Sequence, residues 1–180
     1  MMRFKKMIRV IFLLAVSALF LSGCPGSEDM GVADDRNYLT DIELSILDQV
    51  NQYRTEQGMA PLTLDINIVI QARNHSQNMA EGSVPFSHQG LKERAAATGI
   101  TFDSVSENVA YHQEVSNLAA TVVNGWLQSE GHHKNIIGNF NFTGVGVVPN
   151  PSGRYYFTQI FIRSAEETGP NLSWLRFWDR

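Results

Sequence analysis

Hydrophobic residues recur every three or four positions along much of the chain, a spacing that places them on one face of an α-helix. The first such pattern follows Thr40 and Glu43, which form a capping box, and it stops before Gly58. The second follows Asp65, a helix N-cap residue, and ends near Gly82. The sequence therefore predicts two long helices before residue 83.

Two further helices are predicted later in the chain. A short helix spans residues 91–98, and a long one runs from about residue 116 to residue 130. Gly131 is predicted to end the long helix, because glycine adopts the left-handed cap conformation without a steric penalty. His132 then begins a further turn that Gly138 closes.

The hydrophobic spacing changes to two in three other segments, which predicts β-strands. Residues 102–111 alternate, residues 143–147 alternate with Gly144 and Gly146, and residues 154–163 are apolar on both faces. Alternate glycines leave one strand face without side chains, so another backbone can approach it closely. A sheet that is apolar on both faces needs a cover on each side. The predicted fold class is therefore α+β, an α-β-α sandwich with a central antiparallel sheet between helices.

The N-terminal segment predicts export. Four basic residues precede an apolar run from Val10 to Leu21, which is shorter than the roughly 20 residues of a membrane-spanning helix. The run ends in Leu-Ser-Gly-Cys, which resembles a bacterial lipobox, in which the cysteine is acylated and becomes the mature N-terminus. The predicted organisation is a lipoprotein signal peptide (1–23), an acylated Cys24 with a tether (24–39), one folded domain (40–165) and an aromatic C-terminal tail (166–180).

The charge of the processed chain limits its partners. Of the 14 basic and 18 acidic residues, four basic ones precede Cys24, so the mature net charge is about −8. Such a chain lacks the basic surface that nucleic acid requires, and we expect no nucleic-acid partner. We expect membrane attachment through acyl chains on Cys24. The predicted location is the cell envelope, at the outer membrane or the periplasmic face if the cell is Gram-negative, since Pro25 resembles an outer-membrane sorting residue.

Candidate chemistry is concentrated in three segments. His88 follows Phe86 and Ser87 in a predicted loop, Glu107 lies on an otherwise apolar strand face, and His132 and His133 follow the long helix. Successive helical residues point about 100° apart, so only one of His132 and His133 is expected to face a shared site. No local metal motif links the segments, so any shared site depends on the tertiary structure.

Two residues have a structural interpretation beside the functional one. Burying a bare carboxylate costs several kcal/mol, so Glu107 is either paired with an arginine such as Arg94 or acts as a ligand or general base. His75 lies in the second predicted helix, and no second ligand type shares its face. We therefore expect His75 to be hydrogen-bonded in or beside the core.

Together these segments resemble the CAP superfamily of cysteine-rich secretory proteins, antigen-five venom allergens and plant pathogenesis-related proteins. The resemblance runs from about residue 44 to residue 162 and is strongest to the bacterial, disulfide-free branch. It rests on the order and spacing of several short motifs: Asn51-Gln52-Tyr53-Arg54, Phe86-Ser87-His88, Glu107-Asn108, Trp126, Gly131-His132 and the segments 142–148 and 156–161. The family fold is an α-β-α sandwich, which agrees with the prediction from spacing.

The resemblance also implies a site. In eukaryotic relatives a shallow cleft carries two histidines and two glutamates, and some of these proteins bind a divalent metal there. By position, His88, Glu107 and His132 match three of the four residues, and Glu130 is the hypothetical fourth because it neighbours the matching position, Ser129. Two imidazoles with carboxylates suit Zn²⁺ or a similar ion as cofactor.

The sequence thus favours an exported, lipid-anchored protein whose cleft binds a small-molecule, lipid or envelope ligand, with a divalent metal as candidate cofactor. One alternative is a hydrolase or protease of the envelope, either metal-dependent or with Ser87, Ser106 or Ser129 as nucleophile. Another is lipid binding or adhesion without cleft chemistry, in which the aromatic tail presents a partner surface.

Overall fold

The structure, a computed structural model, describes residues 36, 39–113 and 116–165. The signal peptide, Cys24, most of the tether and the aromatic tail lie outside this range, so those predictions stay predictions. Among the helices of the described residues, none is long and apolar enough to cross a membrane. The elements in chain order are α1 (Asp41–Glu56), β1 (Thr63–Leu64), α2 (Ile66–Glu81), α3 (Leu91–Ala97), β2 (Phe102–Gln113), α4 (Leu118–Gln128), α5 (Glu130–Ile136), β3 (Phe142–Pro149) and β4 (Arg154–Ser164).

The four described strands form one sheet in the order β1-β3-β4-β2. The long strands β3, β4 and β2 pair in antiparallel fashion, as predicted. The short strand β1 pairs parallel to β3 through Thr63 and Leu64, so the sheet as a whole is mixed. This arrangement leaves β2 as an edge strand, which decides where the candidate site lies.

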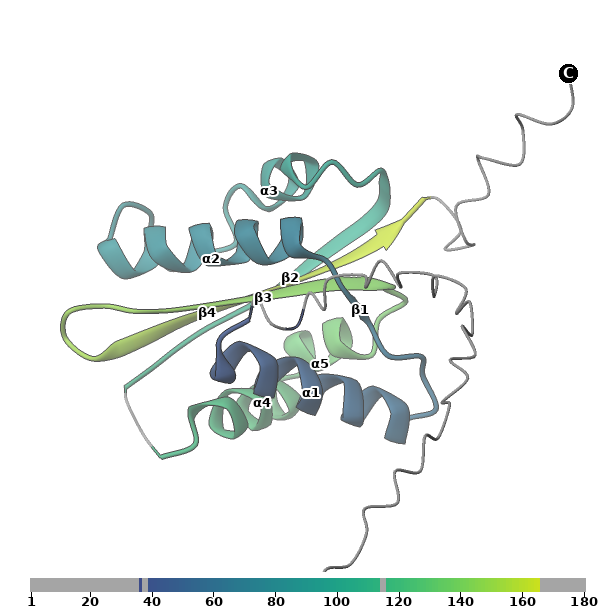
Figure 1. Cartoon of the computed structure of the whole chain (residues 1–180), viewed down its shortest axis with the longest axis horizontal. Helices are drawn as coiled ribbons and strands as arrows, with labels where there is room; N and C mark the ends of the chain where they lie inside the picture. The colour runs from purple at the N-terminus through teal and green to yellow at the C-terminus, as the bar shows by residue number, and fades with distance from the viewer. Residues whose placement is uncertain (1–35, 37–38, 114–115, 166–180) are drawn as a thin grey trace, which may run out of the picture. The chain divides into compact units, whose positions relative to one another are not determined.

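Helices cover both faces of the sheet, which confirms the α-β-α sandwich. Figure 1 shows α2 and α3 on one face and α1, α4 and α5 on the other. Successive residues of β4 face opposite layers, as strand geometry requires. Phe161 packs in the hydrophobic cluster that contains Trp126 of α4, and the adjacent Ile160 packs in the cluster that contains Ile68 and Ala72 of α2.

The glycines of β3 are where α2 approaches the sheet. A Cβ added at Gly144 would lie 2.4 Å from the backbone nitrogen of Val69, and one added at Gly146 would lie 2.2 Å from the backbone nitrogen of Arg73. Real Cβ atoms are never this close to backbone atoms, so only glycine fits. The predicted close backbone approach at these alternating glycines is confirmed.

The predicted capping box at α1 is present and has a second role. Thr40 and Glu43 exchange the two hydrogen bonds of a capping box. The buried Glu43 carboxylate also accepts hydrogen bonds from Arg73 of α2 at 2.8 Å and from the Val147 backbone of β3 at 3.1 Å. Burial alone would raise the pKa of Glu43, but these hydrogen bonds and the Arg73 charge outweigh it and lower the pKa. Glu43 therefore joins α1 to α2 and the sheet.

The prediction that Gly131 ends the long helix is wrong. Helix α4 ends at Gln128, and Ser129 has an extended backbone that separates it from α5, which contains Gly131. Tertiary packing decides this boundary, because Trp126 before the break and Ile136 after it are both buried in the core. The chain turns at Ser129 so that both side chains reach the same hydrophobic cluster.

Candidate functional site

Glu107 is the centre of a polar cluster on the edge strand β2. Its side chain is fully buried, and both carboxylate oxygens have partners. His88 Nδ1 lies 2.9 Å from one oxygen, and Arg94 Nη2 donates to the other at 2.6 Å. The predicted pairing with Arg94 is confirmed, and the same carboxylate also contacts a predicted site histidine. The two partners supply the compensation that a buried carboxylate needs.

His88 is the exposed member of the cluster. It lies in the loop between α2 and α3, and its side chain is 53% exposed. Because an ionised carboxylate only accepts hydrogen bonds, the Glu107 contact assigns the proton of the neutral ring to Nδ1. Nε2 is then the free acceptor of an imidazole whose orientation is set by a buried acid. This geometry suits hydrogen bonding to a ligand or acceptance of a proton.

Arg94 holds the His88 loop against the short helix α3. Its Nη1 donates to the Gln89 backbone oxygen at 2.7 Å while Nη2 contacts Glu107. Its Nε is buried and has no hydrogen-bond partner among the described residues. A buried donor of this kind favours an acceptor nearby.

His75 of α2 lies beneath the cluster and is confirmed as a hydrogen-bonded, buried histidine. Its Nε2 donates to the Ser87 backbone oxygen at 2.8 Å and lies 3.9 Å from a Glu107 oxygen. Burial lowers the pKa of His75 more than the Ser87 contact and the Glu107 charge raise it, so the net direction is down. Sequence reasoning did not connect His75 with the loop that carries Ser87 and His88. The contact arises because the loop folds back over α2, and no local pattern signals that.

The segment that carries His132 meets the edge strand from the other helical layer. It lies on α5 and is half-buried, and its backbone oxygen accepts a hydrogen bond from Asn108 at 3.2 Å. Burial is the main cause that lowers the pKa of His132, and electrostatic repulsion by His88 lowers it further. The structure therefore brings the α5 segment that carries His132 against the strand that carries Glu107, although 25 positions separate these two residues in the sequence.

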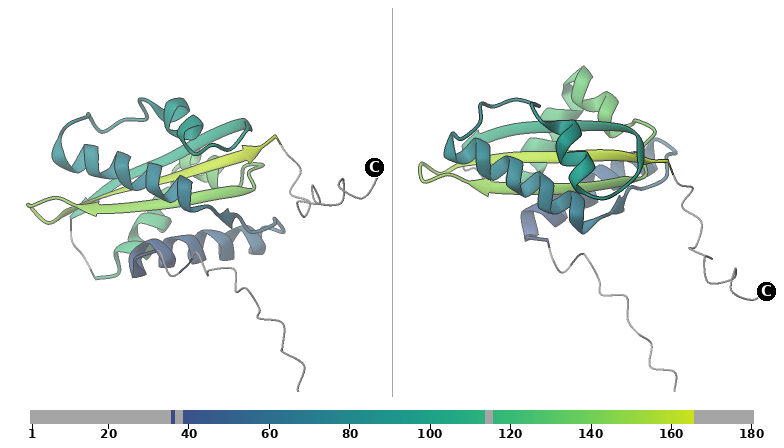
Figure 2. Two further views of the ribbon diagram at one scale, coloured as in Figure 1. Left: turned by 45° about the horizontal axis from the view of Figure 1, so that its top comes forward. Right: turned by 90° about the horizontal axis from the view of Figure 1, so that it is seen from above.

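Two asparagines hold α5 beside the edge strand. Asn135 donates to the Glu107 backbone oxygen at 3.1 Å and to the side-chain oxygen of Asn108 at 2.8 Å. The right-hand view in Figure 2 shows α5 beyond β2, past the border of the sheet. Because β2 has a neighbour on one side only, groups from both layers can meet around it. The predicted tertiary meeting of the three polar segments is confirmed.

The two remaining candidates of the 130–133 segment have other partners. Glu130 is exposed and forms an ion pair with Lys134 at 2.7 Å, and no contact to the cluster is seen within the described residues. His133 Nε2 lies 2.8 Å from the Tyr53 hydroxyl of α1. Since His133 faces α1, this agrees with the expectation that only one of the adjacent histidines points to the shared site. The role of Glu130 as a fourth site residue stays a prediction.

The cluster as arranged does not fit the predicted metal ligand set. Across residues 36, 39–113 and 116–165, no group of three or more His, Cys, Asp or Glu side chains is placed to hold a metal ion. Both oxygens of Glu107 are engaged by His88 and Arg94. The Arg94 guanidinium is also a fixed positive charge beside the carboxylate, and it would repel a cation there. His88 and His132 are the two possible ligands that remain.

A serine nucleophile receives no support from the geometry. A catalytic serine needs a base within hydrogen-bond reach. In the described part of the chain, none of the Ser87, Ser106 and Ser129 hydroxyls is hydrogen-bonded to a histidine ring; Ser87 instead accepts from the Gln89 backbone.

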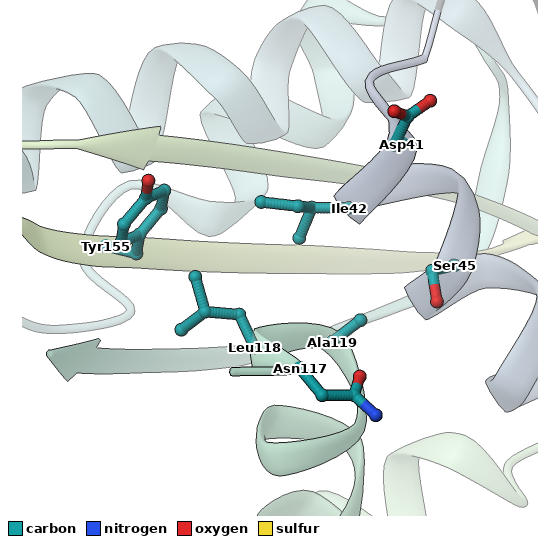
Figure 3. A pocket seen from close by; sticks show the side chains of 7 residues that line it. All are labelled: Asp41, Ile42, Ser45, Asn117, Leu118, Ala119 and Tyr155. Atoms are coloured by element: carbon teal, nitrogen blue, oxygen red, sulfur yellow. The ribbon is translucent and has the colours of Figure 1, made fainter. Parts of the chain in front are cut away.

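A pocket of about 330 Å³ lies away from the cluster, between α1, the start of α4 and β4. Figure 3 shows Ile42, Leu118 and Tyr155 around a common apolar space. Polar side chains also line it, among them Asp41 and Asn117. None of the predicted site residues belongs to it.

The fold and the cluster define an α-β-α sandwich with a histidine and glutamate site at its edge strand. The model of the cysteine-rich secretory protein family, CAP, matches residues 47–161. This chain therefore belongs to the CAP family, as the sequence motifs predict.

Bacterial relatives are similar over the same region. The uncharacterized membrane protein YlbC of Bacillus subtilis is 38% identical over 129 residues, which are 69% of this chain and 35% of the relative. The uncharacterized protein YkwD of the same organism is 35% identical over 67% of this chain and 46% of the relative. This chain thus spans less than half the length of either relative.

A solved structure supports the same assignment. An extracellular protein containing a SCP domain from Bacillus anthracis aligns with a TM-score of 0.59 at 32% identity, covering 68% of this chain and 40% of that chain.

Proposed function

We propose that this chain is an exported protein of the cell envelope that binds a ligand at the cluster of His88, Glu107 and His132. The family assignment supports this proposal, as do the descriptions of the relatives: the Bacillus anthracis protein is called extracellular, and YlbC is called a membrane protein. The lipobox-like segment before Cys24 supports attachment through acyl chains.

The observation that carries the proposal is the orientation of His88. Its ring is held through Nδ1 by a buried carboxylate while the ring itself is 53% exposed. A surface histidine with no function has no need of a buried acid, because water satisfies it. We therefore infer that Glu107 is buried, at a cost in free energy, because it orients His88 so that Nε2 faces a partner.

The cluster favours a ligand that both donates and accepts hydrogen bonds. His88 Nε2 accepts from the ligand. Arg94 Nε, which is buried and has no partner among the described residues, is a donor for a ligand group that enters the cluster. Hydroxyl and carboxylic groups of small molecules, lipids and envelope polymers have this character. A divalent ion such as Zn²⁺ would have to use the imidazoles of His88 and His132, with Glu107 orienting the first of them.

The direct test follows the imidazole NMR signals of His88 and His132 in the full chain. The additions are Zn²⁺ alone and a panel of peptides, lipid esters and envelope glycan fragments. We expect at least one addition to shift both signals in a saturable way. Calorimetry should detect the same binding in the wild type and no binding in the His88→Ala/His132→Ala double variant. His112→Ala, an exchange at the far end of β2, is the matched control and should bind like the wild type. If no addition moves either signal, ligand binding at the cluster is wrong.

The anchor has its own test. Expressed with a radiolabelled fatty acid, the full chain should incorporate label and sediment with membranes, whereas Cys24→Ser should do neither. Label in the Cys24→Ser variant, or none in the wild type, would show that the lipobox interpretation is wrong without affecting the cluster.

A further inference from the structure

A second pocket lies at the opposite edge of the sheet from the His88 cluster. Its volume is about 350 Å³, and it is bordered by the loop after α1, strand β1, the α5–β3 connection and the last residues of β4. Two arginines, Arg54 and Arg163, line it together with the polar side chains of Thr63, Asn139 and Asn141. Among the described residues that line it, none is acidic. In a chain with a net charge of −4, this is a local concentration of positive charge.

Arg54 is a buried cation whose partners, in the described part of the chain, are backbone dipoles. It is 2% exposed, and its guanidinium donates to four backbone oxygens, those of Ala60, Ile136, Gly138 and Phe140. Within the described residues it forms no ion pair with a carboxylate. Four of its five N–H groups are thereby used, which leaves one on Nη2. Burial lowers the pKa of Arg54, as expected where no acid compensates the charge.

Arg163 supplies a second and more accessible charge. It is half-buried near the end of β4, and its side chain has no hydrogen bond or ion pair among the described residues. Neutral donors surround the same space. The Thr63 hydroxyl has no partner within the described range, and Asn141 uses its side-chain oxygen to accept from the Ser164 backbone, which leaves its NH₂ group as a donor.

We propose that this pocket binds a phosphate group, either as the free ion or as a phosphate ester. The Arg163 guanidinium can bind phosphate oxygens in a planar, two-pronged geometry, and Arg54 can add one hydrogen bond from its remaining N–H. The hydroxyl and amide donors can reach the remaining oxygens. A bound anion would also provide Arg54 with the opposite charge that the described residues lack. The pocket exceeds the volume of one phosphate ion, so the organic part of an ester has room. This site is independent of the proposed ligand site at His88.

The test is calorimetric titration of inorganic phosphate into the full chain at constant ionic strength. We expect saturable binding that Arg163→Gln weakens by about tenfold or more, because one charge-assisted contact is lost. Arg154→Gln is the matched control, since Arg154 lies at the other end of the same strand. Both variants should keep the thermal unfolding midpoint of the wild type, and His88→Ala should bind phosphate normally.

Absence of saturable phosphate binding, or equal weakening by Arg154→Gln and Arg163→Gln, would overturn the proposal. A second arm separates the sources of the phosphate group and uses vesicles of phosphatidylcholine with or without phosphatidic acid. If the wild type binds the phosphatidic acid vesicles, if inorganic phosphate displaces it, and if Arg163→Gln does not bind them, the site is assigned to a lipid headgroup. Binding of inorganic phosphate without vesicle binding would assign it to a soluble phosphate compound.

Discussion

The layer of α2 and α3 meets the sheet in two different ways. Over β3, α2 packs backbone against backbone at Gly144 and Gly146, with no side chain between them. Over the edge strand β2, the same layer meets the sheet through the buried charge of Glu107 and its partners His88 and Arg94. The first contact depends only on shape and leaves no space for a larger side chain at either glycine. The second depends on charge and includes the half-exposed imidazole of His88. The candidate site therefore lies at the edge strand of the sheet.

The largest expected effect is at the glycine contact. Gly146→Ala should lower the free energy of unfolding by about 3 kcal/mol, at the upper end of the overpacking range, because the new methyl group would meet the backbone of Arg73. The measurement is urea denaturation followed by circular dichroism. Gly125→Ala in α4 is the control, since its Cβ would have nothing within 4 Å, and it should be neutral or stabilising. Equal stability of Gly146→Ala and the wild type would contradict the close packing.

A smaller loss of stability is expected at the edge cluster. Glu107→Gln removes the charge from the hydrogen bonds to His88 and Arg94 and leaves a mostly buried guanidinium unpaired, which should cost about 2 kcal/mol. Denaturation measures the loss, and the NMR signals of His88 report whether the ring loses its fixed orientation. The control is Glu93→Gln, an exposed exchange on α3 that should change stability by less than about 0.5 kcal/mol. A Glu107→Gln variant as stable as this control would mean that the cluster contributes nothing to stability.

The smallest expected effect is a pH dependence from His75, the α2 residue that reaches the cluster. Its pKa in the folded chain lies below the usual value of 6.5, so the unfolded chain binds the proton more readily. Its contribution to stability is therefore present above pH 6.5 and is lost as the pH falls toward the folded pKa. The free energy of unfolding should decrease between pH 7 and pH 5 less steeply in His75→Gln than in the wild type. His132, whose pKa is also lowered, contributes a slope of the same sign.

The control for this slope is Asn74→Gln, an exposed exchange on the same helix that removes no titratable group and should keep the wild-type pH dependence. The range stops at pH 5 because the Glu43 carboxyl, with its pKa lowered from 4.5, adds its own loss of stability at lower pH. An unchanged slope in His75→Gln would show that His75 is not held neutral by burial.

Several predictions from the sequence hold because they depend on local chemistry. The capping box of Thr40 and Glu43 and the N-cap Asp65 are confirmed, since side chains within three positions of each other satisfy these bonds. The strand predictions are confirmed for the same reason, because the alternation of Gly144 and Gly146 is a property of neighbouring positions. The exception is Gly131, which is predicted to end the long helix but lies within α5. The packing of distant side chains decides where α4 ends and α5 begins.

The sequence by itself determined the helices, the strands, the layered fold and the residue types of the candidate site. Only the tertiary structure decided how those residues combine. His88 and Glu107 form a pair that Arg94 completes, the α5 backbone at His132 meets the edge strand from the opposite layer, and Glu130 pairs with Lys134. The presence of Arg54 and Arg163 in one pocket is likewise invisible in the sequence, where 109 positions separate them. The physical reason is that local pattern sets the direction of a side chain on its own element, whereas its partners depend on how the elements pack.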